Sequence, residues 1–282
     1  MNKIIYVFLL AYSSQIFSMQ LPQQSLVPGG IVVIDLLQNQ DVAPRVYFQD
    51  RRVAVLKNQG KWVALVGIPL SIKPGKHRIL VKYGTSPQQK MPFIVEAKEY
   101  PTQYITIKNK RMVNPYAKDI DRIKNERIPI NKALRTWTPQ TIVDTDFSTP
   151  VDGKLSSPFG LRRFFNKQPR KPHSGLDIAA PKGTPIKAPA DGVVIESGNF
   201  FFNGNSVFLD HGQGLITGYF HMNEIKVKAK QHLKRGDILG TVGETGRVTG
   251  PHLHWNVYLN RTKVDPALFI ANQLPTNQTL AK

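Results

Sequence analysis

The amino-acid sequence predicts an all-β protein in which two β-rich regions are joined by a short helical connector. Both regions contain short runs rich in Val, Ile and aromatic residues, separated by Gly, Pro, Asn and Asp, a pattern typical of strands and tight turns. The second region contains no helix-period segment of useful length. With 282 residues, 41% of them hydrophobic, the chain is long enough for two domains with hydrophobic cores and is not compositionally disordered.

The first 18 residues are predicted to form a secretory signal peptide. Lys3 supplies a positive charge, residues 4–12 are apolar, and residues 13–18 are small and polar enough for cleavage after Ser18. The alternatives are an uncleaved anchor or a buried first strand. The apolar run is too short to be a stable membrane anchor, and we therefore expect an exported protein.

Residues 20–97 are predicted to form an N-terminal β-rich domain. Its strand candidates are residues 31–34, 52–56, 62–66, 77–81 and 93–95. Short strands at this spacing indicate a small β-sandwich. No chemistry is visible in this domain, and the isolated His77 is interpreted as a strand surface residue.

Residues 98–146 are predicted to be a connector with short helices. Asn114, which precedes a proline, is a suitable start for a first helix. Pro129 is expected to end that helix, and Asn131 to begin a second one. Residues 138–150 are expected to form a linker.

Residues 147–271 return to a glycine-rich all-β pattern. The strand candidates are residues 192–195, 206–209, 215–220, 238–242 and 254–259. Tight turns are predicted between them. Residues 272–282 are predicted to be a polar tail.

Composition narrows the choice of partners and of metal ligands. The chain has no cysteine, which excludes disulfides, thiolate ligands and a lipid-acylated cysteine, so a metal would need His, Asp or Glu. The net charge is +19, from 38 Lys+Arg against 19 Asp+Glu, and a basic surface attracts polyanions. No nucleic-acid-binding motif is present. For an exported chain we expect anionic cell-envelope material rather than nucleic acid as the partner; the alternative is a solvated basic surface with no such partner.

Two short motifs carry the ligand chemistry of a zinc site. His252 and His254 are two residues apart, and such residues share one face of a β-strand. His173 and Asp177 add a nitrogen and an oxygen ligand from another segment. Zinc accepts His and Asp ligands, and three protein ligands leave a position open for water, which favours catalysis over a structural site. The alternative is that His-Leu-His belongs to an ordinary half-buried strand.

A fifth candidate, His221, allows a division of roles. His173, Asp177 and His254 can make a three-ligand set, which leaves His221 and His252 beside the metal. A bound zinc lowers the pKa of water from about 15.7 to about 7. A neighbouring imidazole can then act as general base, and a second can stabilise an oxyanion. The set suits hydrolysis, and the His-Glu-x-x-His protease motif is absent.

A series of motifs runs along the second half of the chain: Ser157-Pro-Phe-Gly-Leu-Arg162, His173-Ser-Gly-Leu-Asp177, Ala188-Pro-Ala-Asp-Gly-Val193, Asp210-His-Gly212, Tyr219-Phe-His221 and the run from Gly243 to His254. Together, and in this order, they resemble the lysostaphin/LytM-type zinc metallopeptidases of the M23 family. The resemblance covers residues 155–269. Within it, Val248 stands where a small polar residue is common and Asn256 where an acid is common. Residues 52–75 are similar to N-terminal domains of some envelope M23 proteins.

The resemblance implies a fold, a reaction and a role for each site residue. It implies an antiparallel β LytM-like catalytic domain with an open groove, and a zinc-dependent endopeptidase that cuts peptide bonds of bacterial peptidoglycan. His173, Asp177 and His254 would bind Zn²⁺, and His221 and His252 would be the catalytic pair. A periplasmic enzyme would meet direct D-alanyl–diaminopimelate cross-links.

Other functions remain open from the sequence. Some members with this fold have lost ligands and instead activate a partner hydrolase, so a catalytically silent regulator of an envelope protein is one alternative. A wall-binding module driven by its basic charge is another. The N-terminal domain or the connector could also supply a fourth metal ligand and hold the enzyme inactive.

Overall fold

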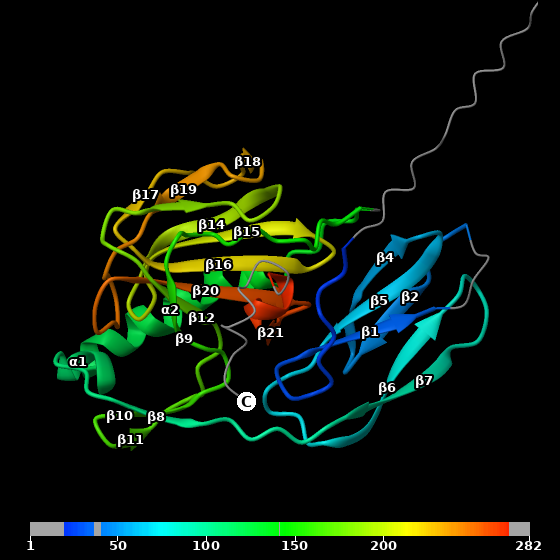
Figure 1. The fold of residues 1–282 in the computed structure, drawn as a ribbon, viewed down its shortest axis with the longest axis horizontal. Coiled ribbons are helices and arrows are strands. Elements are labelled where there is room, and N and C mark those ends of the chain that lie inside the picture. Colours follow the sequence, from blue (N-terminus) through cyan, green and yellow to red (C-terminus); the bar gives the residue numbers. More distant parts are fainter. Residues whose placement is uncertain (1–19, 37–40, 141, 271–282) are drawn as a thin grey trace, which may run out of the picture.

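The computed structural model describes residues 20–36, 41–140 and 142–270, and its two β regions lie side by side (Figure 1). The predicted signal peptide, residues 1–18, and the tail, residues 272–282, lie outside the described residues. No helix among the described residues is long and apolar enough to cross a membrane.

The N-terminal domain is a small β-sandwich, as the sequence predicted. One sheet has the order β1 (Ile31–Asp35), β5 (Lys61–Gly67), β4 (Ala54–Asn58). The other has the order β3 (Arg51–Arg52), β2 (Arg45–Phe48), β6 (Gly75–Lys82), β7 (Gln89–Val95). Their inner faces share one hydrophobic core.

The side chains of β5 point alternately into the sandwich core and into the core of the second region, so this strand joins the two. Ala64 and Val66 lie in the sandwich core, whereas Val63 and Leu65 belong to the core of the C-terminal region. Successive strand residues point to opposite faces, so both faces of this sheet are covered. Gln213, in the turn between two C-terminal strands, donates to the Val55 carbonyl and accepts from the Val55 amide, both at 2.9 Å.

The C-terminal region is built on one large antiparallel sheet. Its strands follow the order β18 (His232–Leu233), β14 (Gly192–Phe200), β15 (Gly204–Gly212), β16 (Leu215–Met222), β20 (His252–Leu259), β12 (Leu176–Ala179), β9 (Lys154–Ser157), with β21 (Thr262–Val264) paired to β20. A smaller sheet has the order β13 (Pro185–Lys187), β19 (Ile238–Thr241), β17 (Glu224–Ile225). A short 3₁₀ helix, η1 (Pro266–Phe269), follows β21. The all-β prediction is confirmed.

The connector contributes a strand to the C-terminal region before it forms helices. Its strand β8 (Thr102–Ile105) pairs in parallel with β10 (Arg162–Phe165), which pairs with β11 (Gln168–Pro169). Helices α1 (Lys110–Val113) and α2 (Ala117–Leu134) follow. The chain therefore runs from the sandwich along the edge of the second domain (Figure 1).

Three expectations for the connector were wrong. Asn114 does not begin a helix but ends α1, and α2 begins at Ala117 with Tyr116 as its N-cap. Helix α2 continues through Pro129 to Leu134 instead of ending there. A proline inside a helix removes one hydrogen bond, but Ile130 and Leu134 pack against the aromatic cluster of the sheet and hold the last turn in place. The segment 138–150 is not a loose linker either, because Phe147 is fully buried in the core.

Candidate active site

Strand pairing brings Asp177 and His254 together. β12 and β20 are antiparallel neighbours in which Asp177 lies directly opposite His254, and such pairs have their side chains on the same face. His254 Nδ1 lies 2.6 Å from Asp177 Oδ1. The sheet therefore places a carboxylate oxygen and an imidazole nitrogen at one point.

His173 reaches the same point from the segment that precedes β12. Its backbone is held on both sides, since its N–H donates to Leu161 O and its carbonyl accepts from Gly160 N, both at 2.8 Å. Its Nδ1–H donates to Pro158 O at 2.7 Å. The ring is therefore the tautomer with a free lone pair on Nε2, which faces Asp177 Oδ1 at 3.0 Å.

Three ligand atoms thus converge, and their chemistry fits a metal ion. His173 Nε2 is 3.1 Å from His254 Nδ1, and both lie close to Asp177 Oδ1. In the His173 tautomer, nitrogen and oxygen lone pairs face each other, which is favourable when a cation lies between them. Zinc bonds of about 2.0–2.2 Å in a tetrahedral arrangement separate ligand atoms by about 3.4 Å, so a small outward movement would admit zinc. Among the described residues this is the group able to hold a metal ion.

The protonation states favour the same conclusion. Burial lowers the pKa of His254 to about 4, against the opposing effect of the Asp177 carboxylate. Burial alone would raise the pKa of Asp177, but His254 and His173 outweigh it and hold that pKa well below its ordinary value. At neutral pH these two groups are a neutral imidazole and a carboxylate, the forms that bind metals.

His221 joins the site through an unusual backbone conformation. It follows Phe220, which pairs with His254 across the sheet, so strand alternation alone would turn His221 to the opposite face. Its φ of +64° breaks that alternation. Its ring centre consequently lies 5.0 Å from that of His252 and 5.9 Å from that of His254. Left-handed backbone at a non-glycine residue costs about 1–3 kcal/mol, and here it brings His221 to the other histidines.

Backbone carbonyls fix the tautomers of His221 and His252. His221 Nδ1–H donates to Thr245 O at 2.8 Å, and His252 Nδ1–H donates to Gly250 O at 2.8 Å. Carbonyls only accept, so in the neutral rings each Nε2 has a free lone pair. Burial is the largest cause that lowers the pKa of His221 well below its ordinary value. His221 is thus a neutral proton acceptor.

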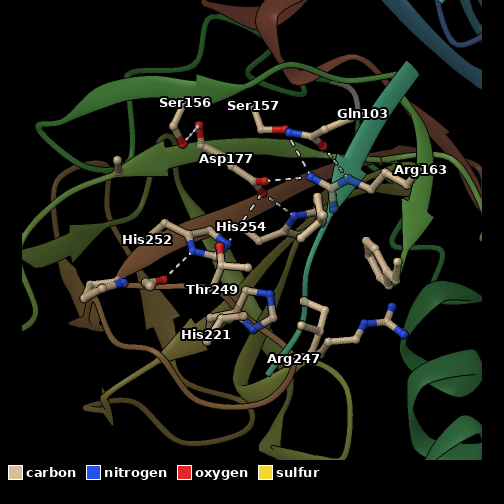
Figure 2. Close-up of a pocket in the computed structure, with 17 residues that line it drawn as sticks. Gln103, Ser156, Ser157, Arg163, Asp177, His221, Arg247, Thr249, His252 and His254 are labelled. Carbon is tan, nitrogen blue, oxygen red and sulfur yellow. Dashed lines mark hydrogen bonds and ion pairs between the residues drawn. The ribbon is translucent and has the colours of Figure 1, made fainter. Parts of the chain in front are cut away.

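Arg163 supports the side of Asp177 that faces away from the histidines. Its Nη2 donates to Asp177 Oδ2 at 3.0 Å and to Ser157 Oγ at 3.1 Å. Its Nε donates to Gln103 Oε1 at 3.1 Å, and Gln103 belongs to the connector strand β8. Figure 2 shows the guanidinium between Asp177 and Gln103. The connector therefore contributes to the support of a candidate ligand.

The site lies in a groove of about 340 Å³. Asp177, His221, His252 and His254 line it together with Arg247 and three connector residues, Gln103, Ile105 and Ile107. One wall therefore comes from the connector and another from the loop before β20 (Figure 2). The N-terminal sandwich places no residue in the metal-ligand group among the described residues.

Three other residues of the recognised motif region, Tyr219, His211 and Asn256, lie outside the groove, whereas Val248 lines it. Tyr219 is fully buried, and its hydroxyl lies 2.8 Å from Thr217 Oγ1 on the opposite face of the sheet. His211 is buried between Thr217 Oγ1 and the carbonyl of Asp191, at 2.8 and 2.7 Å. Asn256 is buried and donates to Tyr258 at 2.9 Å.

The five predicted site residues are brought together, whereas their supporting residues were missed. Arg163 and Thr245 form hydrogen bonds with site residues, and Gln103 forms one with Arg163. Arg163 and Gln103 lie outside the recognised motifs, and Thr245 lies within the run from Gly243 to His254 without a role assigned to it. Arg163 lies next to the recognisable Arg162, and that proximity was the only signal. The structure places the site; the role of each residue is taken up below as a proposal.

Fold and site together define an antiparallel β protein whose open groove presents a candidate three-ligand metal centre. Residues 171–266 match the family model described as peptidase family M23, and residues 24–98 match that of the M23 N-terminal domain. A Pseudomonas aeruginosa crystal structure assigned to peptidase M23 is 44% identical, covers 88% of this chain and 96% of that chain, and has a TM-score of 0.75. This chain belongs to peptidase family M23.

Two curated relatives are similar to the C-terminal region. The DD-carboxypeptidase/endopeptidase Mpg of Neisseria meningitidis is 40% identical over 123 residues, which is 44% of this chain and 28% of the relative. The peptidoglycan DD-endopeptidase ShyC of Vibrio cholerae is 42% identical over 134 residues, 47% of this chain and 30% of the relative. The chain thus matches less than a third of the length of either relative.

Proposed function

We propose that this protein is a zinc-dependent endopeptidase that hydrolyses peptide bonds of bacterial peptidoglycan, in particular D-alanyl–diaminopimelate cross-links. The observation that carries the proposal is the convergence of three metal-ligand atoms beside two imidazoles in an open groove. The similarity to Mpg and ShyC supports the substrate class. Because peptidoglycan lies outside the cytoplasm, the proposal includes export, with the periplasm as the location.

His173, Asp177 and His254 would hold the zinc, through Nε2, Oδ1 and Nδ1 respectively. When bound, zinc supplies a Lewis acid that activates water and polarises the scissile carbonyl. The remaining chemistry belongs to His221 and His252. One of them accepts the proton of the attacking water through Nε2 and returns a proton to the leaving amine. The peptide bond and one water become a carboxylate and an amine.

The tautomers restrict how the second imidazole stabilises an oxyanion. With Nδ1–H committed to a backbone carbonyl, Nε2 of a neutral ring accepts a hydrogen bond and does not donate one. His221 or His252 therefore donates to an oxyanion only after it has gained a proton. A ring therefore accepts a proton first and donates a hydrogen bond to the oxyanion afterwards, so neither role belongs permanently to one histidine.

Metal content and turnover, measured separately, test the proposal. His254→Ala should lose zinc and activity on a purified cross-linked peptide dimer, because it removes a ligand. His221→Ala should keep zinc and lose turnover. His77→Ala, in the distant sandwich, is the control and should behave as wild type. Wild-type protein that holds one zinc and cuts no cross-link would contradict the proposal.

A further inference from the structure

Arg247 lines the groove without a counter-ion. Its guanidinium carbon lies 4.8 Å from the ring centre of Phe165 and 4.5 Å from that of Phe202, contacts that attract a cation to aromatic faces. Within the described part of the chain, no carboxylate lies within salt-bridge distance and no acceptor receives a hydrogen bond from its guanidinium. Its N–H groups are therefore available to a ligand.

The neighbouring arginines differ from Arg247 in this respect. Each has an acceptor: Arg163 has Asp177, Arg111 has Asp119, Arg122 has Glu126, and Arg170 has the carbonyl of Val113. A guanidinium at a groove wall ordinarily finds such a partner, because burying an unpaired charge is unfavourable. Arg247 thus differs from these four arginines, because no acceptor among the described residues pairs with its partly buried guanidinium.

The surroundings of Arg247 favour an incoming anion. Burial, followed by the charges of Arg163 and Arg170, lowers the pKa of Arg247 to about 10. Arg247 is still protonated at neutral pH, and it lies in a region of excess positive charge. A negatively charged ligand group would reduce this repulsion on binding.

The loop that carries Arg247 also supports His221. The Arg247 N–H donates to Phe202 O at 2.9 Å, and Thr245, two residues earlier, accepts from His221 Nδ1 at 2.8 Å. Both side chains are therefore fixed to one short loop. Figure 2 shows the Arg247 side chain extending away from His221 along the groove. A group bound there would lie to one side of the histidines.

We propose that Arg247 binds the substrate carboxylate that flanks the scissile bond. This inference rests on the proposed function. A carboxylate matches the planar N–H edge of a guanidinium in two parallel hydrogen bonds. In a D-alanyl–diaminopimelate cross-link, the carbon that bears the scissile nitrogen also bears a free carboxylate. Arg247 would thereby distinguish the acid from its carboxamide, and so determine which cross-links are cut.

The test uses the zinc-loaded full chain and two synthetic cross-linked peptide dimers. The dimers differ only in that this diaminopimelate carboxylate is free in one and amidated in the other. A hydrogen bond to a charged group is lost in the amide, so wild type should prefer the acid by about 10- to 100-fold in kcat/KM. Arg247→Met should slow only the acid substrate and abolish the preference. Arg247→Lys keeps the positive charge but cannot form the two parallel hydrogen bonds, so it should retain part of the preference for the acid.

Arg127→Met, on the exposed surface of α2, is the matched control and should keep the full preference. Equal cleavage of the two dimers by wild type, or an equal loss on both dimers in Arg247→Met, would overturn the inference. If wild type cleaves neither dimer, the proposed function fails, and calorimetric binding of the two dimers still decides the role of Arg247. Tighter binding of the acid that depends on Arg247 would support it, and equal binding of acid and amide would refute it.

Discussion

Replacing Arg163 with methionine should weaken metal binding without removing any candidate ligand. Arg163 holds Oδ2 of Asp177 at 3.0 Å, whereas Oδ1 faces His173 and His254. Methionine has a similar apolar length but no donor. The Asp177 side chain would then lose the contact that fixes its orientation, and its buried charge would lose a partner.

The contact between Arg163 and Asp177 sets the expected loss of zinc affinity. A hydrogen bond to a charged group contributes about 1.5–3 kcal/mol, and each 1.4 kcal/mol is about a tenfold change in affinity. Arg163→Met should therefore weaken zinc binding by about 10- to 100-fold, in the range usual for partners of metal ligands. Gln103 acts one contact further away, through a hydrogen bond of 3.1 Å to Arg163. Gln103→Ala should thus cost only a few-fold, and Asp177→Asn should cost the most.

Competition with a chelator of known zinc affinity would measure this series. Arg162→Met is the matched control, because the preceding arginine on β10 has an exposed side chain. Circular dichroism would verify that each variant is folded. Wild-type zinc affinity in Arg163→Met, or a larger loss in Gln103→Ala than in Arg163→Met, would refute the reasoning.

Three further substitutions test the space around the candidate metal site, the stability of α2 and the protonation state of a buried histidine. A Cβ at Gly175 would lie 2.6 Å from His254 Nε2, whereas one at Gly198 meets nothing closer than 3.6 Å. Gly175→Ala should therefore lose metal and Gly198→Ala should not; zinc retained by Gly175→Ala would contradict this geometry. Pro129→Ala should raise the free energy of unfolding by about 1–3 kcal/mol, measured with denaturant, since it restores a helix hydrogen bond; an unchanged midpoint would argue against it. Burial lowers the pKa of His211, so below about pH 6.5 the unfolded chain gains a proton that the folded protein does not. The free energy of unfolding should then fall by up to about 1.4 kcal/mol per pH unit as pH decreases, and His211→Asn should flatten this slope; equal slopes would contradict it.

The sequence predicted the all-β architecture because, in both regions, short strand-forming runs with a two-residue side-chain period lie between turn residues. The pattern predicts a strand over residues 62–66, and β5 spans Lys61–Gly67. Alternation along β5 does not reveal what covers each face. That Val63 and Leu65 contact the second domain depends on residues about 150–200 positions away, which a local pattern does not contain.

Local sequence propensity predicted the wrong structure in two segments where contacts with distant residues outweigh it. Pro129 normally ends a helix, but contacts of the following turn with the sheet keep α2 continuous. Residues 138–150 have the composition of a linker, although Phe147 is stacked on Phe269 in the core, with ring centres 5.0 Å apart. In both cases the deciding partner lies far away in sequence.

In the site, too, local sequence predicts some residues, whereas others depend on contacts between distant segments. Spacing predicted that His252 and His254 share one strand face, and the resemblance assigned His221 to the catalytic pair. Alternation could not have supplied His221, because it reaches the groove only through its positive φ. Arg163 lies outside the recognised motifs, and Arg247 lies within the run from Gly243 to His254, where the sequence gives it no role of its own. Their importance depends on which acceptors surround each guanidinium, and only the folded arrangement shows that.

The most direct test is mass spectrometry of the muropeptides released from purified sacculi by the zinc-loaded protein. We expect cross-linked dimers to disappear and monomers to accumulate, with a new D-alanine carboxylate and a free diaminopimelate amine. His221→Ala with a full zinc content should leave the dimers intact. Dimers that persist with wild-type protein holding one zinc would contradict the proposal that this groove cuts peptidoglycan cross-links.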